Sequence, residues 1–237
     1  MIEPGSPAIG GGAGAGFRVI VLLGAPGAGK GTQGEVLAEH LGLPRIATGD
    51  LFRAAVSEGT PLGLEVRQYM DRGELVPDQL TVRMLLRRLA QRDAARGAIL
   101  DGFPRSEAQA GALDAALAEC GLRVELAPFI EVPAEDLSAR LSGRWMCRAA
   151  GHTYHERAKP PSRPGLCDID GSPLYQRDDD RPEVVRARLD NQLGALAEVV
   201  EYYRSRGVLR AVDGRQSIDA VSRDLLAAVG ARDEAGV

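Results

Sequence analysis

The sequence predicts an α/β fold in which a central parallel sheet lies between layers of helices. Short apolar runs of strand length alternate with segments of helical periodicity. A glycine-rich loop follows the first of these runs directly. With 237 residues, the chain is long enough for one main α/β domain that carries small inserted subdomains.

The first strand is expected at 18–23, where a β-branched run lies between glycines, as is typical of a strand buried on both faces. Further apolar runs predict strands at 98–100, 127–132 and 207–212. The segments between and after them have apolar residues at helical spacing, which predicts helices at 33–40, 80–92, 183–204 and 219–229. Regular alternation of the two element types favours parallel pairing of the strands.

Two stretches, 47–76 and 143–180, interrupt this alternation at positions where loops would overhang the carboxyl edge of the sheet. The first is helical in pattern and the second reads as a separate small module. We therefore expect a disordered glycine-rich leader at 1–16, an α/β domain at 17–232 and a frayed tail at 233–237. Within the α/β domain, the core is expected at 17–46, 77–139 and 178–232, and the two inserts at 47–76 and 140–177.

Composition excludes several classes of protein. Apolar residues make up 44% of the chain, but no apolar run approaches the ~18 residues typical of a membrane span. The net charge of -4, with no long block of Lys and Arg, argues against nucleic acid as a partner. Three cysteines are too few and odd in number for a secreted disulfide framework, and they predict a cytoplasmic location.

The segment GAPGAGKGT at 24–32 fits the phosphate-loop pattern G-x-x-x-x-G-K-[ST], except that Gly31 separates Lys30 from Thr32. Glycines allow the backbone to curl until successive N–H groups form a nest for phosphate oxygens, and the lysine adds a cation. The alternative is a flexible turn between a strand and a helix, for which the glycines alone would suffice. Lysine in register, with a strand before and a helix after, favours the phosphate loop.

A phosphate loop alone indicates a nucleotide but no particular reaction. Two further blocks, TGDLFR at 48–53 and LDGFPR at 100–105, follow the loop in the order and spacing seen in adenylate kinases. Over about 18–225 the chain resembles the long-lid, bacterial type of this family. The resemblance implies a three-layer P-loop kinase with a nucleoside-monophosphate-binding insert and a long lid. It also implies a monomer that transfers phosphoryl reversibly, with Mg²⁺, from ATP to AMP to give two ADP.

The resemblance also implies the site residues. Those expected to bind ATP are Gly27, Ala28, Gly29, Lys30, Gly31, Thr32, Arg140, Arg144, Thr153, Tyr154 and Gln216. Those expected to bind AMP are Thr48, Arg53, Glu74, Leu75, Val76, Gly102, Phe103, Pro104, Arg105, Gln109, Arg177 and Arg188. Those expected to act in catalysis are Lys30, Asp101, Arg105, Arg144, Arg177 and Arg188.

The chemistry of these residue types agrees with their expected roles. Guanidinium forks such as those of Arg53 and Arg105 orient an anionic acceptor phosphate better than a point charge does. Asp101, after an apolar strand, is suited to ordering the water shell of the magnesium that accompanies ATP. Taken alone, Arg53 reads as a solvated helix residue, and Asp101 as a turn or helix N-cap aspartate.

The second insert also carries a candidate metal site. Zinc-type lids in the family have Cys-x2-Cys followed by Cys-x2-Cys or Cys-x2-Asp, and this chain has Ala150 at the second ligand position. His152 lies two residues further on, so that Cys147, His152, Cys167 and Asp170 are expected to hold a structural Zn²⁺. The alternatives are a metal-free lid held by hydrogen bonds, a small core of reduced thiols, and a zinc-ribbon module for nucleic acid.

Two other functions remain possible at this point. One is a kinase for UMP, CMP or GMP, against which the long lid and Gln109 argue. The other is an ATP-binding regulatory subunit without turnover, against which the complete set of arginines argues.

Overall fold

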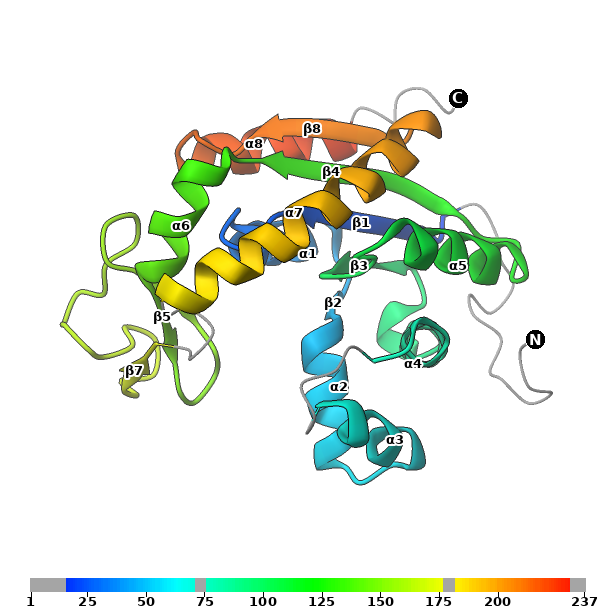
Figure 1. The fold of residues 1–237 in the computed structure, drawn as a ribbon, viewed down its shortest axis with the longest axis horizontal. Coiled ribbons are helices and arrows are strands. Elements are labelled where there is room, and N and C mark those ends of the chain that lie inside the picture. The colour runs from blue at the N-terminus through cyan, green and yellow to red at the C-terminus, as the bar shows by residue number, and fades with distance from the viewer. Residues whose placement is uncertain (1–15, 71–75, 177–181, 231–237) are drawn as a thin grey trace.

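The computed structural model describes residues 16–70, 76–176 and 182–230. Residues 1–15 of the expected leader, the expected tail at 233–237, Glu74, Leu75 and Arg177 lie outside these ranges. Its main sheet has five parallel strands in the order β2-β3-β1-β4-β8 (Figure 1). The central strand β1 is flanked by β3 and β4, so the chain first builds one half of the sheet and then the other. The strands are β1 (Arg18–Gly24), β2 (Arg45–Ala47), β3 (Gly97–Asp101), β4 (Val124–Glu131) and β8 (Leu209–Asp213).

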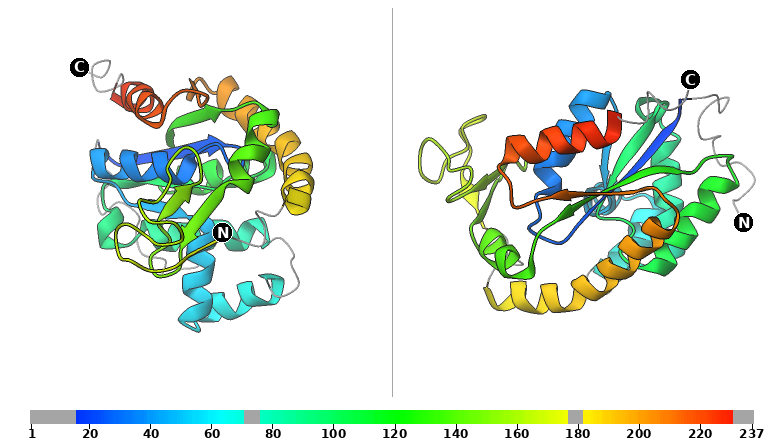
Figure 2. Two further views of the ribbon diagram at one scale, coloured as in Figure 1. Left: turned by 90° about the vertical axis from the view of Figure 1, so that its left-hand side faces the viewer. Right: turned by 90° about the horizontal axis from the view of Figure 1, so that it is seen from above.

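Helices cover both faces of this sheet, and alternate residues of β1 belong to two different cores. Val19, Val21 and Leu23 pack with one set of helices, whereas Ile20 and Leu22 pack with the other. Figure 2 shows α1 and α8 on one face and α5 and α7 on the other. The helices are α1 (Lys30–Leu41), α4 (Asp78–Leu89), the 3-10 turn η1 (Arg92–Ala94), α5 (Glu107–Ala118), α6 (Ala134–Ser142), α7 (Pro182–Ser205) and α8 (Ile218–Gly230).

Two units project from this three-layer core (Figure 1). The first insert forms the helix pair α2 (Thr48–Ser57) and α3 (Pro61–Met70), which packs with α4 around Val66, Leu80 and Met84. The second forms its own three-stranded antiparallel sheet, called the lid here, in the order β6-β5-β7. Its strands are β5 (Arg144–Cys147), β6 (Thr153–His155) and β7 (Leu174–Tyr175).

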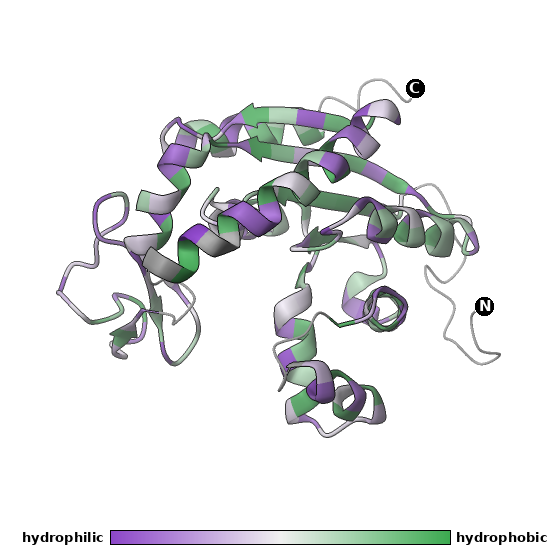
Figure 3. Ribbon diagram, viewed as in Figure 1, coloured by the Kyte–Doolittle hydropathy of each residue, from purple (hydrophilic) through white to green (hydrophobic). Residues whose placement is uncertain are grey.

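Hydropathy follows these layers. The strands of the main sheet are mostly hydrophobic, while the outward faces of the helices and the lid loops are mixed (Figure 3). None of the helices described is both long and apolar enough to cross a bilayer.

The structure confirms the predicted α/β class and parallel sheet, with differences at single elements. The strand expected at 127–132 begins three residues earlier, at Val124, and the short strand β2 was not expected. The strand expected at 207–212 begins only at Leu209, because Gly207 has a φ of +71° and forms a turn after α7. Cys120 lies in the turn just after α5 and packs on the core.

Candidate functional site

The glycine-rich loop joins the buried strand β1 to α1 at the carboxyl edge of the main sheet. Gly27 and Gly29 have φ values of +84° and +100°, a region that side chains disfavour. A Cβ on Gly27 would also lie 2.9 Å from Cγ of Leu141 on α6, so α6 can pack closely only against a glycine. The loop therefore delivers its main chain to the N-terminus of α1, where backbone N–H groups and the helix dipole favour anions.

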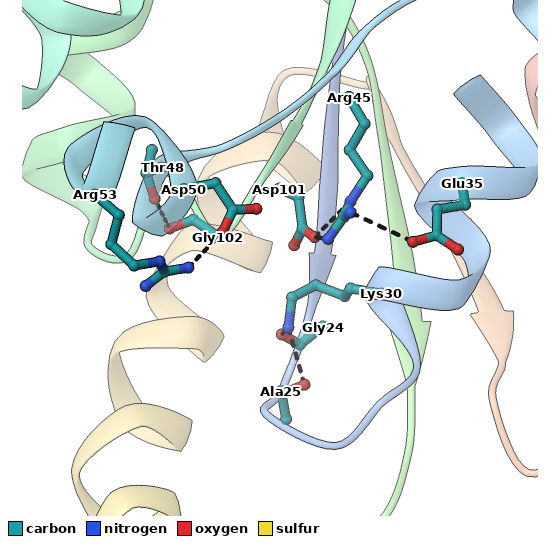
Figure 4. A network of polar contacts seen from close by, with 10 residues as sticks. All are labelled: Gly24, Ala25, Lys30, Glu35, Arg45, Thr48, Asp50, Arg53, Asp101 and Gly102. Carbon is teal, nitrogen blue, oxygen red and sulfur yellow. Dashed lines mark hydrogen bonds and ion pairs between the residues drawn. The ribbon is translucent and has the colours of Figure 1, made fainter. Parts of the chain in front are cut away.

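Lys30, the first residue of α1, turns back over this loop. Its ammonium donates to the carbonyl oxygens of Gly24 at 2.7 Å and Ala25 at 3.0 Å (Figure 4). Carbonyl oxygens are weaker acceptors for an ammonium group than phosphate oxygens are. The lysine is thus held at the loop by contacts that an anionic ligand can replace.

Asp101 ends β3 beside this loop, since Leu22 of β1 pairs with it in the parallel register. It is only 8% exposed, and its Oδ2 accepts from Nε of Arg45 at 3.0 Å and from Nη2 at 2.7 Å. Asp101 caps no helix, because the N-cap of α5 is Ser106. The alternative interpretation of Asp101 as an N-cap is therefore wrong.

The next residue, Gly102, faces a second group of polar residues. Its carbonyl oxygen accepts from the Thr48 hydroxyl at 3.2 Å and from Nε of Arg105 at 2.8 Å. Gln109 accepts from the backbone amide of Arg105 at 2.7 Å. Arg53, on α2, forms an ion pair with Asp50, and its side chain is 55% exposed. The sequence motifs at 48–53 and 100–105 thus meet at the start of α2.

Other residues predicted to bind AMP belong to the core or to another helix. Phe103 is buried in the core and is joined to Pro104 by a cis peptide bond. Val76 is buried against α4, while Arg188 lies on α7 and its side chain is not among those described. The roles of these residues stay predictions.

The predicted ATP-binding residues outside the phosphate loop lie on α6, on the lid and in the loop after β8. Arg140 donates from Nη2 to the carbonyl oxygen of Gly214 at 2.9 Å, two residues before Gln216. Arg144 and Thr153 lie on the paired strands β5 and β6. Tyr154 is 3% exposed and its hydroxyl lies 3.4 Å from Sγ of Cys167, so its phenol points into the lid.

The lid brings the four predicted metal ligands together. One ligand atom from each of Cys147, His152, Cys167 and Asp170 lies within 4.8 Å of the others. Nδ1 of His152 is 3.3 Å from Sγ of Cys167 and 3.5 Å from Oδ2 of Asp170. A tetrahedron with zinc–ligand bonds of about 2.0–2.3 Å has ligand separations of roughly 3.3–3.8 Å, so a small closure would complete it.

The surroundings of Cys147 and Asp170 lower the pKa of both groups. Burial raises the pKa of Cys147, but hydrogen bonds from the Ser172 hydroxyl and the Ala150 amide outweigh it and lower the pKa to about 7. The Ser172 amide, followed by the thiol of Cys147, holds the pKa of Asp170 below its usual range. Thiolate and carboxylate are the forms that bind a metal ion.

Sequence reasoning missed three contributors to these sites. Ser172 and the hydroxyl of Tyr154 contact the cluster sulfurs, and Arg45 holds Asp101. A signal existed for Arg45, because it precedes the TGDLFR motif by three residues, but its strand has only three residues and escaped notice.

A phosphate loop at the carboxyl edge of a parallel sheet, next to a second set of arginine and hydroxyl groups, defines the class of P-loop phosphotransferases. The sequence profile described as "Adenylate kinase" matches residues 22–208. The chain is 48% identical over 208 residues to the adenylate kinase of Thermodesulfovibrio yellowstonii, covering 88% of this chain and 97% of that one. It is also 48% identical over 206 residues to that of Bacillus subtilis, covering 87% and 95% of the two chains. The chain belongs to the adenylate kinase family.

Proposed function

We propose that this chain transfers the γ-phosphoryl group of ATP reversibly to AMP, with Mg²⁺, and so serves adenine nucleotide homeostasis and AMP salvage. The observation that carries the assignment of the two subsites is the junction at the end of β3. The side chain of Asp101 lies on the phosphate-loop side, whereas the carbonyl of its neighbour Gly102 binds Thr48 and Arg105. Two consecutive residues therefore link a donor subsite to an acceptor subsite.

In the donor subsite the phosphate loop, from Gly27 to Thr32, binds the phosphates through main-chain N–H groups, and Lys30 moves from the loop carbonyls onto them. A magnesium ion fits beside this loop, because the Asp101 carboxylate is nearly buried there and its oxygens can accept hydrogen bonds from a metal-bound water. When bound, magnesium neutralises charge on the phosphates. Asp101 orients the water shell, and Lys30 stabilises charge that develops on the transferred group.

In the acceptor subsite Arg53 and Arg105 bind the AMP phosphate, while Thr48 and Gln109 bind the polar edge of adenine. Arg53 exchanges its exposed ion pair with Asp50 for the phosphate, which is favourable because exposed ion pairs contribute little to stability. Since the attacking phosphate oxygen is already anionic, no general base is required. Positioning and electrostatic stabilisation carry the reaction.

Closure of the lid brings further cations to the phosphates and excludes water, which prevents hydrolysis. We assign this role to Arg140 and Arg144, together with Arg177 and Arg188. Thr153 and Tyr154 contact ATP from β6; because the phenol of Tyr154 faces Cys167, its main chain is the part assigned to this contact. Gln216 borders the adenine through its main chain.

An acceptor assay tests the proposal. AMP, GMP, CMP and UMP are compared in a coupled assay for ADP, and AMP is expected to be the preferred acceptor. R105A is expected to raise the KM for AMP by about 10-fold or more, which corresponds to the loss of one charged hydrogen bond. R83A is the matched control, since Arg83 is an exposed arginine of α4 whose partner is Glu65. Preference for another nucleotide, or equal effects of both variants, would contradict the assignment.

We also propose that Cys147, His152, Cys167 and Asp170 bind one structural Zn²⁺. The small size of the hydrophobic core of the lid supports this proposal. That core comprises Cys147, Tyr154 and Cys167, with Leu174 packed against them. So small a core rarely stabilises a module without a metal or a disulfide. Four protein ligands leave no open position, so the metal would take no part in the chemistry.

Metal analysis of protein purified without chelator decides between zinc and a hydrogen-bonded lid. One zinc per chain is expected in the wild type and in C120S, and much less in C167S. Cys120 is the matched control because it is the third free cysteine and lies outside the lid. A zinc content near zero in the wild type would refute the proposal. The monomeric state and the cytoplasmic location stay predictions, the first of which sedimentation velocity can test.

A further inference from the structure

We propose that Arg45 is a positioning residue for phosphoryl transfer: it fixes the Asp101 carboxylate and thereby the water shell of the magnesium that ATP brings. This inference depends on the donor subsite proposed above. Figure 4 shows the Arg45 guanidinium between Asp101 on one side and Glu35 on the other, close to Lys30 and the phosphate loop.

The register of the sheet places Arg45 where it can reach Asp101. On the edge strand β2, Arg45 pairs with Ile99 and Ala47 pairs with Asp101. Arg45 is therefore the diagonal neighbour of Asp101 on the same face of the sheet, at a separation that only a long side chain can bridge. Both Nε and Nη2 of its guanidinium donate to a single carboxylate oxygen, Oδ2 of Asp101. No bond to Oδ1 is seen among the described residues.

Helix α1 is shaped around this side chain. A Cβ on Gly34 would lie 2.8 Å from Cδ of Arg45 and 3.0 Å from its Nε, and one on Gly31 would lie 3.7 Å from Nη2. Glycine inside a helix is unfavourable, so a reason for its presence is expected. Here the absence of a side chain at Gly34 leaves space for the Arg45 side chain to extend from β2 to Asp101. The outer nitrogen Nη1 lies 3.8 Å from Oε1 of Glu35, which is 70% exposed.

The charge balance explains why the carboxylate needs this partner. Asp101 is nearly buried, and a buried carboxylate without a cation is unfavourable. Lys30 also lies beside the loop, but it must be available for phosphate. With Arg45 in place, the Asp101 carboxylate has a charged partner and is held in one orientation without drawing Lys30 away from the loop. Arg45 thus acts through Asp101.

The test measures metal affinity directly. Mn²⁺ is titrated into the complex of the full chain with a non-hydrolysable ATP analogue, and free Mn²⁺ is followed by electron paramagnetic resonance. We expect R45Q to weaken Mn²⁺ binding by about 5-fold or more, as substitution of outer-shell residues does at other metal sites. R45K keeps the charge but loses the fork, so it should lie between R45Q and the wild type. In steady state, R45Q should need more free Mg²⁺ for half-maximal rate, with the KM for AMP unchanged.

R18Q is the matched control for a purely structural effect. Arg18 forms a 2.8 Å ion pair with Glu125 at the amino end of β1, and its side chain is 18% exposed, compared with 25% for Arg45. R18Q should bind Mn²⁺ as the wild type does. D101N is the positive control, and it should weaken Mn²⁺ binding at least as much as R45Q.

The outcomes separate the two proposals. Wild-type Mn²⁺ affinity in R45Q, together with a clear loss in D101N, would overturn the role of Arg45 and leave the donor subsite intact. Wild-type affinity in D101N would remove the role of Asp101 itself, and the role of Arg45 with it. An equal loss in R45Q and R18Q would show that Arg45 contributes only to general stability, which also overturns the inference.

Discussion

Tyr202 and Tyr203, adjacent on α7, are expected to respond in opposite ways when each loses its hydroxyl group. Tyr203 is fully buried, and among the described residues its hydroxyl has no hydrogen-bond partner, so burial raises its pKa. The Tyr202 hydroxyl, in contrast, donates to Oδ2 of Asp114 on α5 at 2.9 Å. The two rings contact each other edge to face at 5.1 Å, and phenylalanine would preserve this contact at either position.

An unsatisfied buried hydroxyl costs about 1–3 kcal/mol, whereas a satisfied hydrogen bond contributes about 1 kcal/mol. Tyr203→Phe removes the cost and leaves a small void, so a gain of about 1 kcal/mol in unfolding free energy is expected. Tyr202→Phe removes the bond and should lose about 1 kcal/mol. For a chain of this size each change corresponds to roughly 2–4 °C in Tm.

Urea unfolding followed by circular dichroism, with the slope m unchanged, measures both values. The decisive quantity is the sign of the change in unfolding free energy of each variant relative to the wild type. A loss of stability in Tyr203→Phe would refute the reasoning, because it would mean that the hydroxyl is satisfied, for example by a buried water shared with Oδ1 of Asp114.

Three further predictions concern the site and its supports. Lys30→Met should lower kcat by at least about 100-fold with Tm unchanged, and near-normal turnover in the coupled assay would contradict its role. Burial raises the pKa of Asp114, partly offset by the Tyr202 hydrogen bond, so its folded form keeps the proton to higher pH than the unfolded chain does. The unfolding free energy of the wild type should therefore fall relative to that of Asp114→Asn as pH rises from the pKa of Asp114 in the unfolded chain through its raised pKa in the folded protein. Urea unfolding of both proteins at several pH values measures this difference, and a difference that does not change with pH would contradict the prediction. Gly34→Ala should stay within about 1 kcal/mol of wild-type stability, because better helix propensity offsets the displaced Arg45, yet it should weaken Mn²⁺ binding as R45Q does; unchanged Mn²⁺ affinity would argue against the steric link.

The parts of the fold that sequence could predict are those in which burial is continuous. The strand β1 is buried along nearly its whole length, so its apolar run was unambiguous. The strand β2 was missed because only its middle residue is buried and its first is a charged arginine. The lid strands β5, β6 and β7 have only four, three and two residues, and no long apolar run marks them.

Within the site, the residues to which we assign ligand binding could be proposed from sequence because they belong to motifs with fixed spacing. The four residues predicted to bind zinc lie together in the lid, even though His152 stands away from the usual position. Residues that position these side chains are harder to recognise in the sequence, since their contacts depend on how distant segments are aligned in the fold. Ser172 and Tyr154 reach the cluster sulfurs only because β6 and the turn before β7 fold over them.

Arg45 illustrates the physical reason for that limit. Its contact with Asp101 requires a parallel register between β2 and β3, a diagonal reach across that register, and an opening in α1 at Gly34. No spacing along the chain encodes these three conditions together, because they join segments that are 56 residues apart. A carboxylate predicted at the end of a buried strand nevertheless carries a usable rule: it needs a cation, and the neighbouring strand is the first place to look for one.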